Sequence, residues 1–273
     1  MFYNVIDLFI KGTSIMNAIL ETVDLVKRFG GLVAVNNVSI KVKRNAITML
    51  IGPNGAGKTT LINVCTGVIK PDKGKVYFNP YNSKCEKLDI TGWPPHKVYR
   101  SGFVRTFQIP QPFLALTVLE NVLTALGNRG ESPWIAPFRH AWIREEEEKM
   151  RNAFKILKLV GLDKYWDYEA YKLGAGQLKM LEVARALATG AKLIALDEPI
   201  GGTDPAYASE IFKHIRGLLK AMDVSFLVIE HRIDIALPYA DYVYVMDKGS
   251  IIAEGTPNEV VKNPKVIQAY IGE

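Results

Sequence analysis

The sequence is poor in cysteine and lacks several patterns that would place it in a common class of protein. Its two cysteines, Cys65 and Cys85, share no metal-ligand spacing, so we expect them to be reduced thiols of a cytosolic protein. No run of residues has the length and apolarity of a membrane-spanning helix, and no long tract is of low complexity. The guanine-reading motif N-K-x-D is also missing, which disfavours a GTPase.

The first ten residues are apolar but do not resemble a signal peptide, because Asp7 interrupts them and no basic segment precedes them. Met16 could be a second start site. We therefore expect residues 1–16 to be a poorly ordered extension and residues 17–273 to be the folded domain. A chain of 273 residues, 48% of them hydrophobic, can bury a substantial core as one large domain or as one domain with an inserted lobe.

The segment Gly52–Thr60 matches G-x-x-x-x-G-K-[ST], the phosphate-binding loop. A short apolar run, Ala46–Ile51, precedes it as a buried strand would, and the residues after it can begin a helix. Glycines let such a loop turn tightly, and its N–H groups and the helix N-terminus attract phosphate. We expect Lys58 to bridge the β- and γ-phosphates, the Thr59 hydroxyl to ligate Mg²⁺ and Thr60 to add a phosphate contact. A Gly-rich turn without a ligand is the weaker interpretation.

Two further apolar strands are predicted to end in polar side chains. The first lies within Lys192–Pro199 and ends in the carboxylates Asp197 and Glu198. The second begins at Val224 and ends in His231. Ligands gather at the carboxyl edge of parallel strands. Asp197 is expected to hold Mg²⁺ directly or through water, and Glu198 to polarise a water. A lone histidine is usually structural, but beside two carboxylates it could contact a γ-phosphate.

Three features carry weaker signals. Phe29, in the turn Lys27–Gly31, could stack on a base or pack in the core with about equal weight. Gln108 is expected at the end of a strand that leads into a proline-containing loop, where it could reach Mg²⁺ or water; a solvated surface glutamine is the commoner outcome. Leu173–Gln177 precedes a helix expected over 178–188, and glycines there would suit an anion, although such helix starts are more often structural.

The remaining pattern predicts an α/β fold with added parts. Two strands, Ile19–Val26 and Val33–Val42, are expected to form an antiparallel layer beside the phosphate loop. Residues from about 117 to 173 are expected to form a mostly helical inserted subdomain, which begins with a capping box at Thr117. A hairpin is expected over Tyr242–Ile252, followed by a last helix from Thr256, and residues 79–95 are expected to be irregular. Asp204 is expected to be the N-cap residue of a helix that begins at Pro205.

These motifs in this order resemble the nucleotide-binding subunits of ABC transporters over nearly the whole chain, from about Ile19. The resemblance implies a P-loop NTPase core with an antiparallel β subdomain and an inserted α-helical subdomain. It implies that Phe29 stacks on adenine, that Gln108 is the Q-loop glutamine, and that Leu173–Gln177 takes the place of the LSGGQ signature. Glu198 is similar to the catalytic glutamate and His231 to the switch histidine.

The functional residues that follow from the resemblance fall into three groups. The catalytic residues are Lys58, Gln108, Glu198 and His231. The metal-binding residues are Thr59, Gln108 and Asp197. The ATP-binding residues are Phe29, Val35, Gly52, Pro53, Asn54, Gly55, Ala56, Gly57, Lys58, Thr59, Thr60, Gln108, Gly174, Ala175, Gly176 and Gln177.

A narrower resemblance is to the larger-lobed ATP-binding subunit of branched-chain amino-acid importers. It rests on Arg105–Pro112, Phe29–Gly31 and the closing Ala269–Glu273. The chain departs from the family at the signature, where Gly174 replaces the serine and Ala175 the first glycine. Losing the serine hydroxyl removes one contact to a charged group, which costs about 1–3 kcal/mol. Residues 202–204 also differ from the usual D-loop, which affects communication between sites.

The resemblance implies that two such chains, identical or different, sandwich two ATP molecules with Mg²⁺. The expected partners are membrane-spanning permease subunits and, indirectly, a solute-binding protein, at the cytoplasmic face of the membrane. No nucleic-acid partner is expected, although the net charge of +6 permits one. The alternatives are a soluble ABC ATPase acting on nucleic acid or ribosomes, and a weakly hydrolysing regulatory subunit, which the changes at Gly174 and Ala175 would suit.

Overall fold

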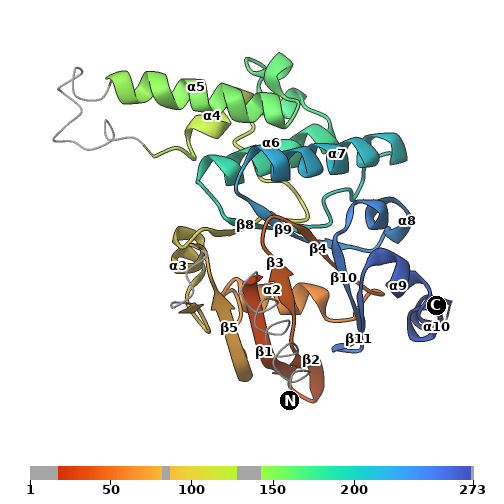
Figure 1. Ribbon diagram of the computed structural model, residues 1–273. Coiled ribbons are helices and arrows are strands. Elements are labelled where there is room, and N and C mark those ends of the chain that lie inside the picture. Colours follow the sequence, from red (N-terminus) through yellow and green to blue (C-terminus); the bar gives the residue numbers. More distant parts are fainter. Residues whose placement is uncertain (1–17, 82–86, 128–142, 272–273) are drawn as a thin grey trace, which may run out of the picture. The chain divides into compact units, whose positions relative to one another are not determined.

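The computed structural model describes residues 18–81, 87–127 and 143–271 (Figure 1). These residues form two compact units. The first, here called the sheet unit, comprises the described residues up to 105, residues 192–198 and those from 223 onward. The second, the helical unit, comprises the described residues of 106–191 and 199–222. The expected extension at 1–16, the second start at Met16 and the thiol of Cys85 lie outside the described residues.

The centre of the sheet unit is a six-stranded sheet in the order β11-β10-β4-β9-β8-β7. Its strands pair in parallel, except for the antiparallel hairpin of β10 and β11. The strands β4, β8 and β9 are buried along their whole length, which explains their mostly apolar sequences. Their bounds are β4 Ile47–Ile51, β7 Phe103–Arg105, β8 Leu193–Asp197, β9 Ser225–Glu230, β10 Tyr242–Asp247 and β11 Ser250–Gly255.

The parallel register of this sheet brings the polar strand ends together. Asp197 at the end of β8 lies opposite Ile229 of β9, and Glu230 at the end of β9 lies opposite Ile51, the last residue of β4. The phosphate loop follows Ile51 directly. The loop and the acidic strand ends therefore occupy the same edge of the sheet, as the sequence predicts.

A second, antiparallel sheet has the order β2-β1-β5-β6, with β3 also paired to β1. The prediction of one strand over Val33–Val42 was wrong, because the chain bends between β2 and β3. Asn37 has a positive φ of 50°. The Thr22 hydroxyl accepts from the Ile40 N–H at 2.9 Å and donates to the Val38 carbonyl at 3.2 Å, which replaces ladder bonds. The bounds are β1 Ala18–Phe29, β2 Leu32–Val38, β3 Lys41–Lys43, β5 Lys73–Phe78 and β6 Leu88–Asp89.

The helices of the sheet unit are short. The helix α2, over Lys58–Cys65, follows the phosphate loop as expected, and burial raises the pKa of its free thiol, Cys65, to about 12. The region expected to be irregular contains β6 and the first residue of α3. The last helix was predicted as one element but is two, because Pro264 begins a second. The bounds are α3 Pro95–Arg100, α8 Ile233–Ala236, α9 Pro257–Val261 and α10 Pro264–Ile271.

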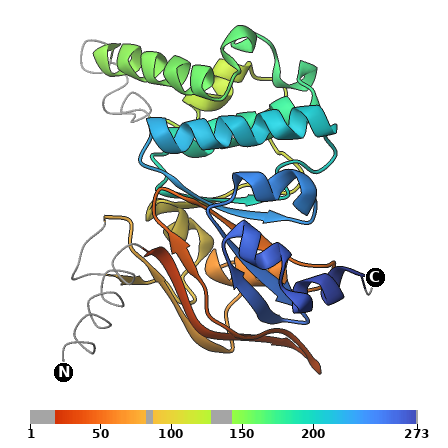
Figure 2. The ribbon, with the colours of Figure 1, turned by 45° about the vertical axis from the view of Figure 1, so that its right-hand side comes forward.

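In the helical unit, four helices pack on one another (Figure 2). Two predicted caps are confirmed. Thr117 and Glu120 form the capping box of α4, and the Asp204 carboxylate accepts from the N–H groups of Ala206 and Tyr207 at 3.0 Å, which begins α7. None of the helices in the described ranges is long and apolar enough to cross a membrane. The bounds are α4 Val118–Leu123, α5 Ile143–Leu159, α6 Ala175–Ala188 and α7 Pro205–Ala221.

Two boundaries differ from the prediction near expected site residues. The strand expected to reach Gln108 ends at Arg105, because β7 pairs only with the first three residues of β8. The helix expected from Leu178 begins at Ala175, with Gly174 as its N-cap residue. Gln108 therefore lies in a loop, and the residues in the signature position form the first turn of α6.

Candidate functional site

The phosphate loop is held in a shape that its glycines require. Gly52, Gly55 and Gly57 have φ values of 151°, 75° and 100°, where side chains are unfavourable. A Cβ on Gly57 would lie 2.2 Å from the Ala34 carbonyl oxygen, and one on Gly52 would lie 2.0 Å from the Met246 carbonyl oxygen. At Gly52 and Gly57 the loop thus packs directly against neighbouring backbone, with no space for a methyl group at either position.

The Lys58 ammonium lies inside this loop and binds its backbone. Its Nζ donates to the carbonyl oxygens of Gly52 at 2.6 Å and Pro53 at 2.8 Å, and the side chain is buried. Lys58 is also the first residue of α2, whose first turn contains no acidic residue. An ammonium, a helix N-terminus and a glycine-rich loop are features that suit a phosphate group, so this loop fits a phosphate.

The edge beside the loop brings together three predicted residues. Glu198 follows β8 with a positive φ of 49°, and its N–H donates to the Ile229 carbonyl at 2.9 Å. This turn places the Glu198 Oε1 atom 3.4 Å from Nδ1 of His231. His231 is the residue after β9, and its N–H contacts the carboxylate of the fully buried Glu230 at 3.3 Å. A carboxylate and an imidazole in contact can hold and orient a water or a phosphate oxygen.

Asp197 has a partner that the prediction did not include. The Arg105 guanidinium donates through Nη2 to Oδ2 of Asp197 at 2.6 Å, and its Nη1 contacts the Asn63 side-chain oxygen on α2. Thr59 lies on the same helix, so hydroxyl and carboxylate oxygens, the ligands that Mg²⁺ prefers, come from α2 and β8. This donor set fits Mg²⁺, with the second carboxylate oxygen of Asp197 outside the Arg105 contact. Within the described residues, no three carboxylate, histidine or cysteine side chains form a cluster that could hold a metal.

Two residues expected to bind ATP, Phe29 and Val35, differ in exposure. Phe29, at the end of β1, is 47% exposed, and its ring centroid lies 5.5 Å from Nζ of Lys27. Its ring is therefore available for stacking. Val35 on β2 is fully buried in the hydrophobic core of the sheet unit. Core packing therefore encloses the Val35 side chain, and the assignment of Val35 to the ATP-binding residues stays a prediction.

The predicted residues Gln108 and Gly174–Gln177 belong to the helical unit. The backbone carbonyl of Gln108 accepts from Nζ of Lys179 on α6. The Gly174 N–H donates to Oε1 of Gln177 at 2.9 Å, which completes the N-terminus of α6. Ala175 and Gly176 lie between them. A hollow of about 330 Å³ opens at this helix start, and it is lined by Gly174, Ala175, Gly176, Gln177, Gly202, Thr203, Asp204 and Tyr207.

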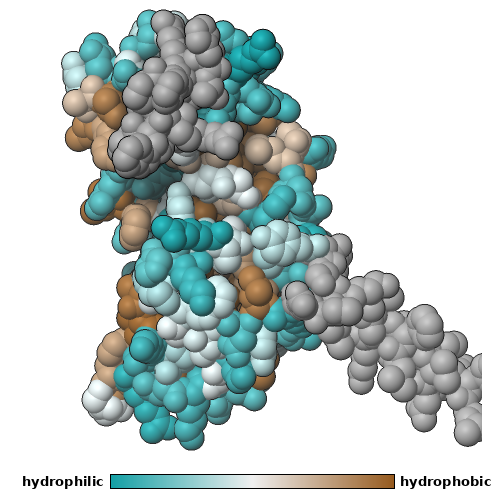
Figure 3. Space-filling view, turned by 90° about the vertical axis from the view of Figure 1, so that its left-hand side faces the viewer, coloured by the Kyte–Doolittle hydropathy of each residue, from teal (hydrophilic) through white to brown (hydrophobic). Residues whose placement is uncertain are grey.

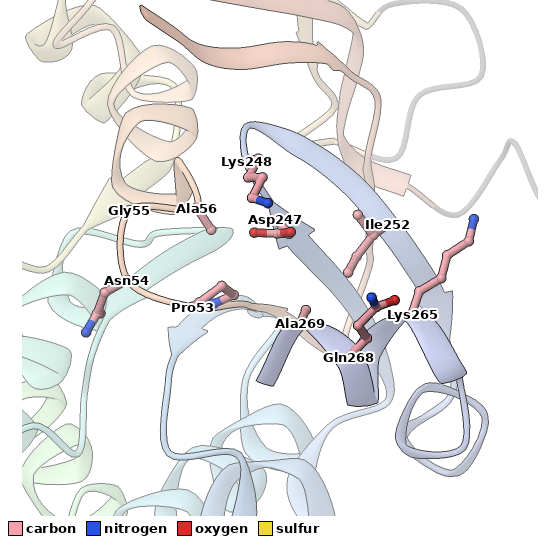
Figure 4. Close-up of a pocket in the computed structure, with 10 residues that line it drawn as sticks. All are labelled: Pro53, Asn54, Gly55, Ala56, Asp247, Lys248, Ile252, Lys265, Gln268 and Ala269. Carbon is pink, nitrogen blue, oxygen red and sulfur yellow. The ribbon is translucent and has the colours of Figure 1, made fainter. Parts of the chain in front are cut away.

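A larger cavity, of about 630 Å³, lies along the outer flank of the phosphate loop (Figure 4). The loop forms one wall, the turn between β10 and β11 another, and α10 the third. The Gly249 N–H of that turn donates to the Ala56 carbonyl at 3.0 Å, which ties the hairpin to the loop. The C-terminal helix therefore faces the phosphate loop. The lining residues are Pro53, Asn54, Gly55, Ala56, Asp247, Lys248, Ile252, Lys265, Gln268 and Ala269.

The start of α6 yields a stability prediction. A Cβ on Gly176 would lie 2.0 and 2.2 Å from two ring carbons of Tyr207, whereas one on Gly174 would meet only Oε1 of Gln177, at 3.7 Å. Alanine in place of glycine favours a helix by about 1 kcal/mol, so Gly176→Ala would stabilise the protein if space were available. Because the ring must move, we expect Gly176→Ala to lower the free energy of unfolding by about 1–3 kcal/mol.

Urea denaturation of both variants measures this effect. The matched control is Gly174→Ala, at a residue whose φ of −71° suits alanine. It should change the free energy of unfolding by less than about 0.5 kcal/mol. A Gly176→Ala protein as stable as the unmodified chain would contradict the contact with Tyr207.

Comparison with known proteins adds three findings. Residues 35–201 match the family model described as ABC transporter, and residues 250–273 match the model described as branched-chain amino acid ATP-binding cassette transporter. The chain is 49% identical over 254 residues to a probable branched-chain amino acid transport ATP-binding protein LivG of Archaeoglobus fulgidus, covering 93% of this chain and 95% of that protein. It is 37% identical to the high-affinity branched-chain amino acid transport ATP-binding protein BraF of Pseudomonas aeruginosa, covering 93% and 98%.

Among solved structures, the chain is similar to the ADP conformation of an ATP-binding cassette of an ABC transporter. The two chains are 47% identical, the TM-score is 0.79, and the match covers 94% of this chain and 99% of that one. A nucleotide-free ATP-binding cassette from an ABC transporter matches with a TM-score of 0.78 and 47% identity. The predicted fold class, an ABC ATPase cassette with an antiparallel β part and a helical part, is confirmed.

Proposed function

The chain belongs to the ABC transporter family, and we propose that it is the ATP-binding and ATP-hydrolysing subunit of an importer for branched-chain amino acids. One observation supports this most strongly. A phosphate loop closed by Lys58 and a contacting pair, Glu198 and His231, lie at one edge of the same sheet. The names of relatives that match nearly the whole chain support the solute class.

Within this proposal, ATP is the substrate and each residue has a role that its position supports. Lys58 and the N–H groups of the loop bind the phosphates, and Phe29 stacks on the base. Thr59 and Asp197 would hold Mg²⁺, which offsets negative charge on the phosphates when bound. Glu198 orients and polarises the attacking water, and His231, 3.4 Å away, positions Glu198 and contacts the γ-phosphate. Gln108, in the loop after β7, would also contribute a ligand to Mg²⁺.

The helical unit is proposed to complete the site of a second chain. Gly174–Gln177 present the N-terminus of α6 and a hollow beside it, which suit the γ-phosphate bound by the partner. Two chains would then enclose two ATP molecules, and one chain alone would hydrolyse ATP slowly. We also propose that residues 17–273 form the folded domain and that residues of about 117–173 form its helical subdomain. The chain is proposed to lie at the cytoplasmic face of the membrane.

The membrane partner is proposed to bind the segment after β7. Four large hydrophobic side chains there are exposed, namely Phe107, Ile109, Phe113 and Leu114, with Ile109 at 74%. Figure 3 shows, on one face of the molecule, that hydrophobic side chains reach the surface among hydrophilic ones. Exposed apolar groups that gather in one segment indicate a protein interface. A solute-binding protein would act through the permease subunits and not on this chain directly.

A pull-down with the membrane-spanning subunits tests this function. The chain should copurify with them, and its ATP turnover should rise at least about tenfold in the assembled complex when a branched-chain amino acid and its binding protein are added. Ile109→Glu should abolish copurification and leave ATP binding intact. The matched control is Val68→Glu, at a side chain that is 54% exposed in the sheet unit.

Two results would contradict the proposal. Copurification with RNA instead of membrane protein would favour a soluble ATPase, and an assembled complex without phosphate release would favour a regulatory subunit. Equal loss of copurification in both glutamate variants would remove the segment after β7 as the contact.

A further inference from the structure

The guanidinium of Arg105 joins two parts of the nucleotide site. Arg105 is the last residue of β7 and lies opposite Ala195, two positions before Asp197 on β8. Its Nη2 lies 2.6 Å from Oδ2 of Asp197, and its Nη1 contacts the side-chain oxygen of Asn63. Both charged side chains are nearly enclosed, with exposed fractions of 12% for Arg105 and 8% for Asp197.

This pair is poorly suited to a role in stability alone. Removing two charges from water costs free energy that a buried ion pair only partly recovers, and packed apolar residues of similar size often stabilise a fold as well. The flanking positions of β8 are apolar and fully buried, so the fold already provides such packing. Arg105 places a fixed positive charge beside the carboxylate that is expected to hold a metal. This position indicates that the pair affects metal binding.

We propose that Arg105 is a positioning residue that holds Asp197 and weakens the binding of Mg²⁺ with the product ADP. The inference rests on the proposed function. The guanidinium occupies one carboxylate oxygen of Asp197, and its positive charge would disfavour a metal ion bound at the other oxygen. Asp197 would then hold Mg²⁺, and with it the product, less tightly than an unpaired aspartate would.

The contact with Asn63 connects Arg105 to α2, the helix that follows the phosphate loop. Asn63 is on α2, the helix that begins with Lys58 and Thr59. The planar guanidinium can contact Asp197 and Asn63 at once, which a lysine ammonium on a flexible stem does with less fixed geometry. Arg105 therefore connects the acidic end of β8 to the helix that carries the other metal ligand, Thr59.

Isothermal titration calorimetry with ADP tests the inference without hydrolysis. The quantity measured is the ratio of the dissociation constant in EDTA to that in saturating Mg²⁺, which reports the contribution of the metal. We expect Arg105→Gln to raise this ratio about tenfold, because a neutral side chain no longer competes for Asp197. Arg105→Lys keeps the charge and should stay within about threefold of the unmodified protein.

The outcomes separate the inference from the function on which it rests. Failure of the unmodified chain to bind ADP would overturn the proposed function. An unmodified chain that binds ADP with a metal contribution, together with an unchanged or lower ratio in Arg105→Gln, would overturn the inference. Equal changes in the glutamine and lysine variants would also overturn it, since they would show a packing effect. Should Arg105→Gln not fold, Arg105→Met, also neutral and unbranched, gives the same comparison.

Discussion

Glu198→Gln is expected to lower ATP turnover at least about a hundredfold while changing ATP affinity by less than about threefold, because only the general base is removed. Glutamine keeps the shape of the side chain and can still contact Nδ1 of His231, which lies 3.4 Å from Oε1. It cannot accept a proton or polarise a water as a carboxylate does. The ATP-bound form should therefore accumulate as a dimer.

The backbone supports this role for Glu198. A φ of 49° is unfavourable for a residue with a side chain, and such conformations concentrate at functional sites. The N–H bond to Ile229, on the neighbouring strand, holds the turn and so fixes where the carboxylate points. A structural role alone would not require glutamate at this position.

Phosphate release by the assembled complex and light scattering of the isolated chain with ATP measure the two effects. Glu254→Gln provides the matched control, because Glu254 is an exposed glutamate on β11, which β10, β4 and β9 separate from β8 in the sheet. The control should turn over ATP at the unmodified rate and form no stable dimer. Turnover above a tenth of the unmodified rate in Glu198→Gln would assign the base to another group.

The sequence predicted the parts of the site that depend on local signals. The buried strand, glycine loop and helix at 46–65 follow from apolar runs and backbone freedom, and the structure has them in those places. The polar ends of two apolar strands, at Asp197 and His231, were expected at one sheet edge, since parallel pairing aligns such ends. The caps at Thr117 and Asp204 needed only their own residues and the next few along the chain.

Features that depend on contacts between distant residues were not predicted. The pair of Arg105 and Asp197 forms only because β7 lies beside β8 in the sheet, and nothing in either segment indicates that neighbour. The burial of Val35 in the core also depends on distant residues, since the side chains that enclose it come from several strands and helices. The break between β2 and β3 depends on the hydroxyl of Thr22, on another strand. The roles proposed for the site residues remain predictions.

Gly57→Ala is expected to lower the free energy of unfolding by about 3–5 kcal/mol and to abolish measurable ADP binding, because strain and overlap add. The new methyl group would lie 2.2 Å from the Ala34 carbonyl oxygen and 2.8 Å from the Met246 side chain, at a φ of 100°. The residues on either side of Ala34, Val33 and Val35, both pair with β1, so we expect the loop itself to move away from Lys58.

Gly55→Ala separates overlap from backbone strain in the same loop. Gly55 also has a positive φ, 75°, but a Cβ there would meet no atom within 4 Å. Its cost should be the strain alone, about 1–2 kcal/mol. Urea denaturation should therefore distinguish the two alanine variants by at least about 1 kcal/mol. Equal destabilisation would show that the loop does not rest on Ala34 and Met246, and the argument that neighbouring backbone fixes its shape would fail.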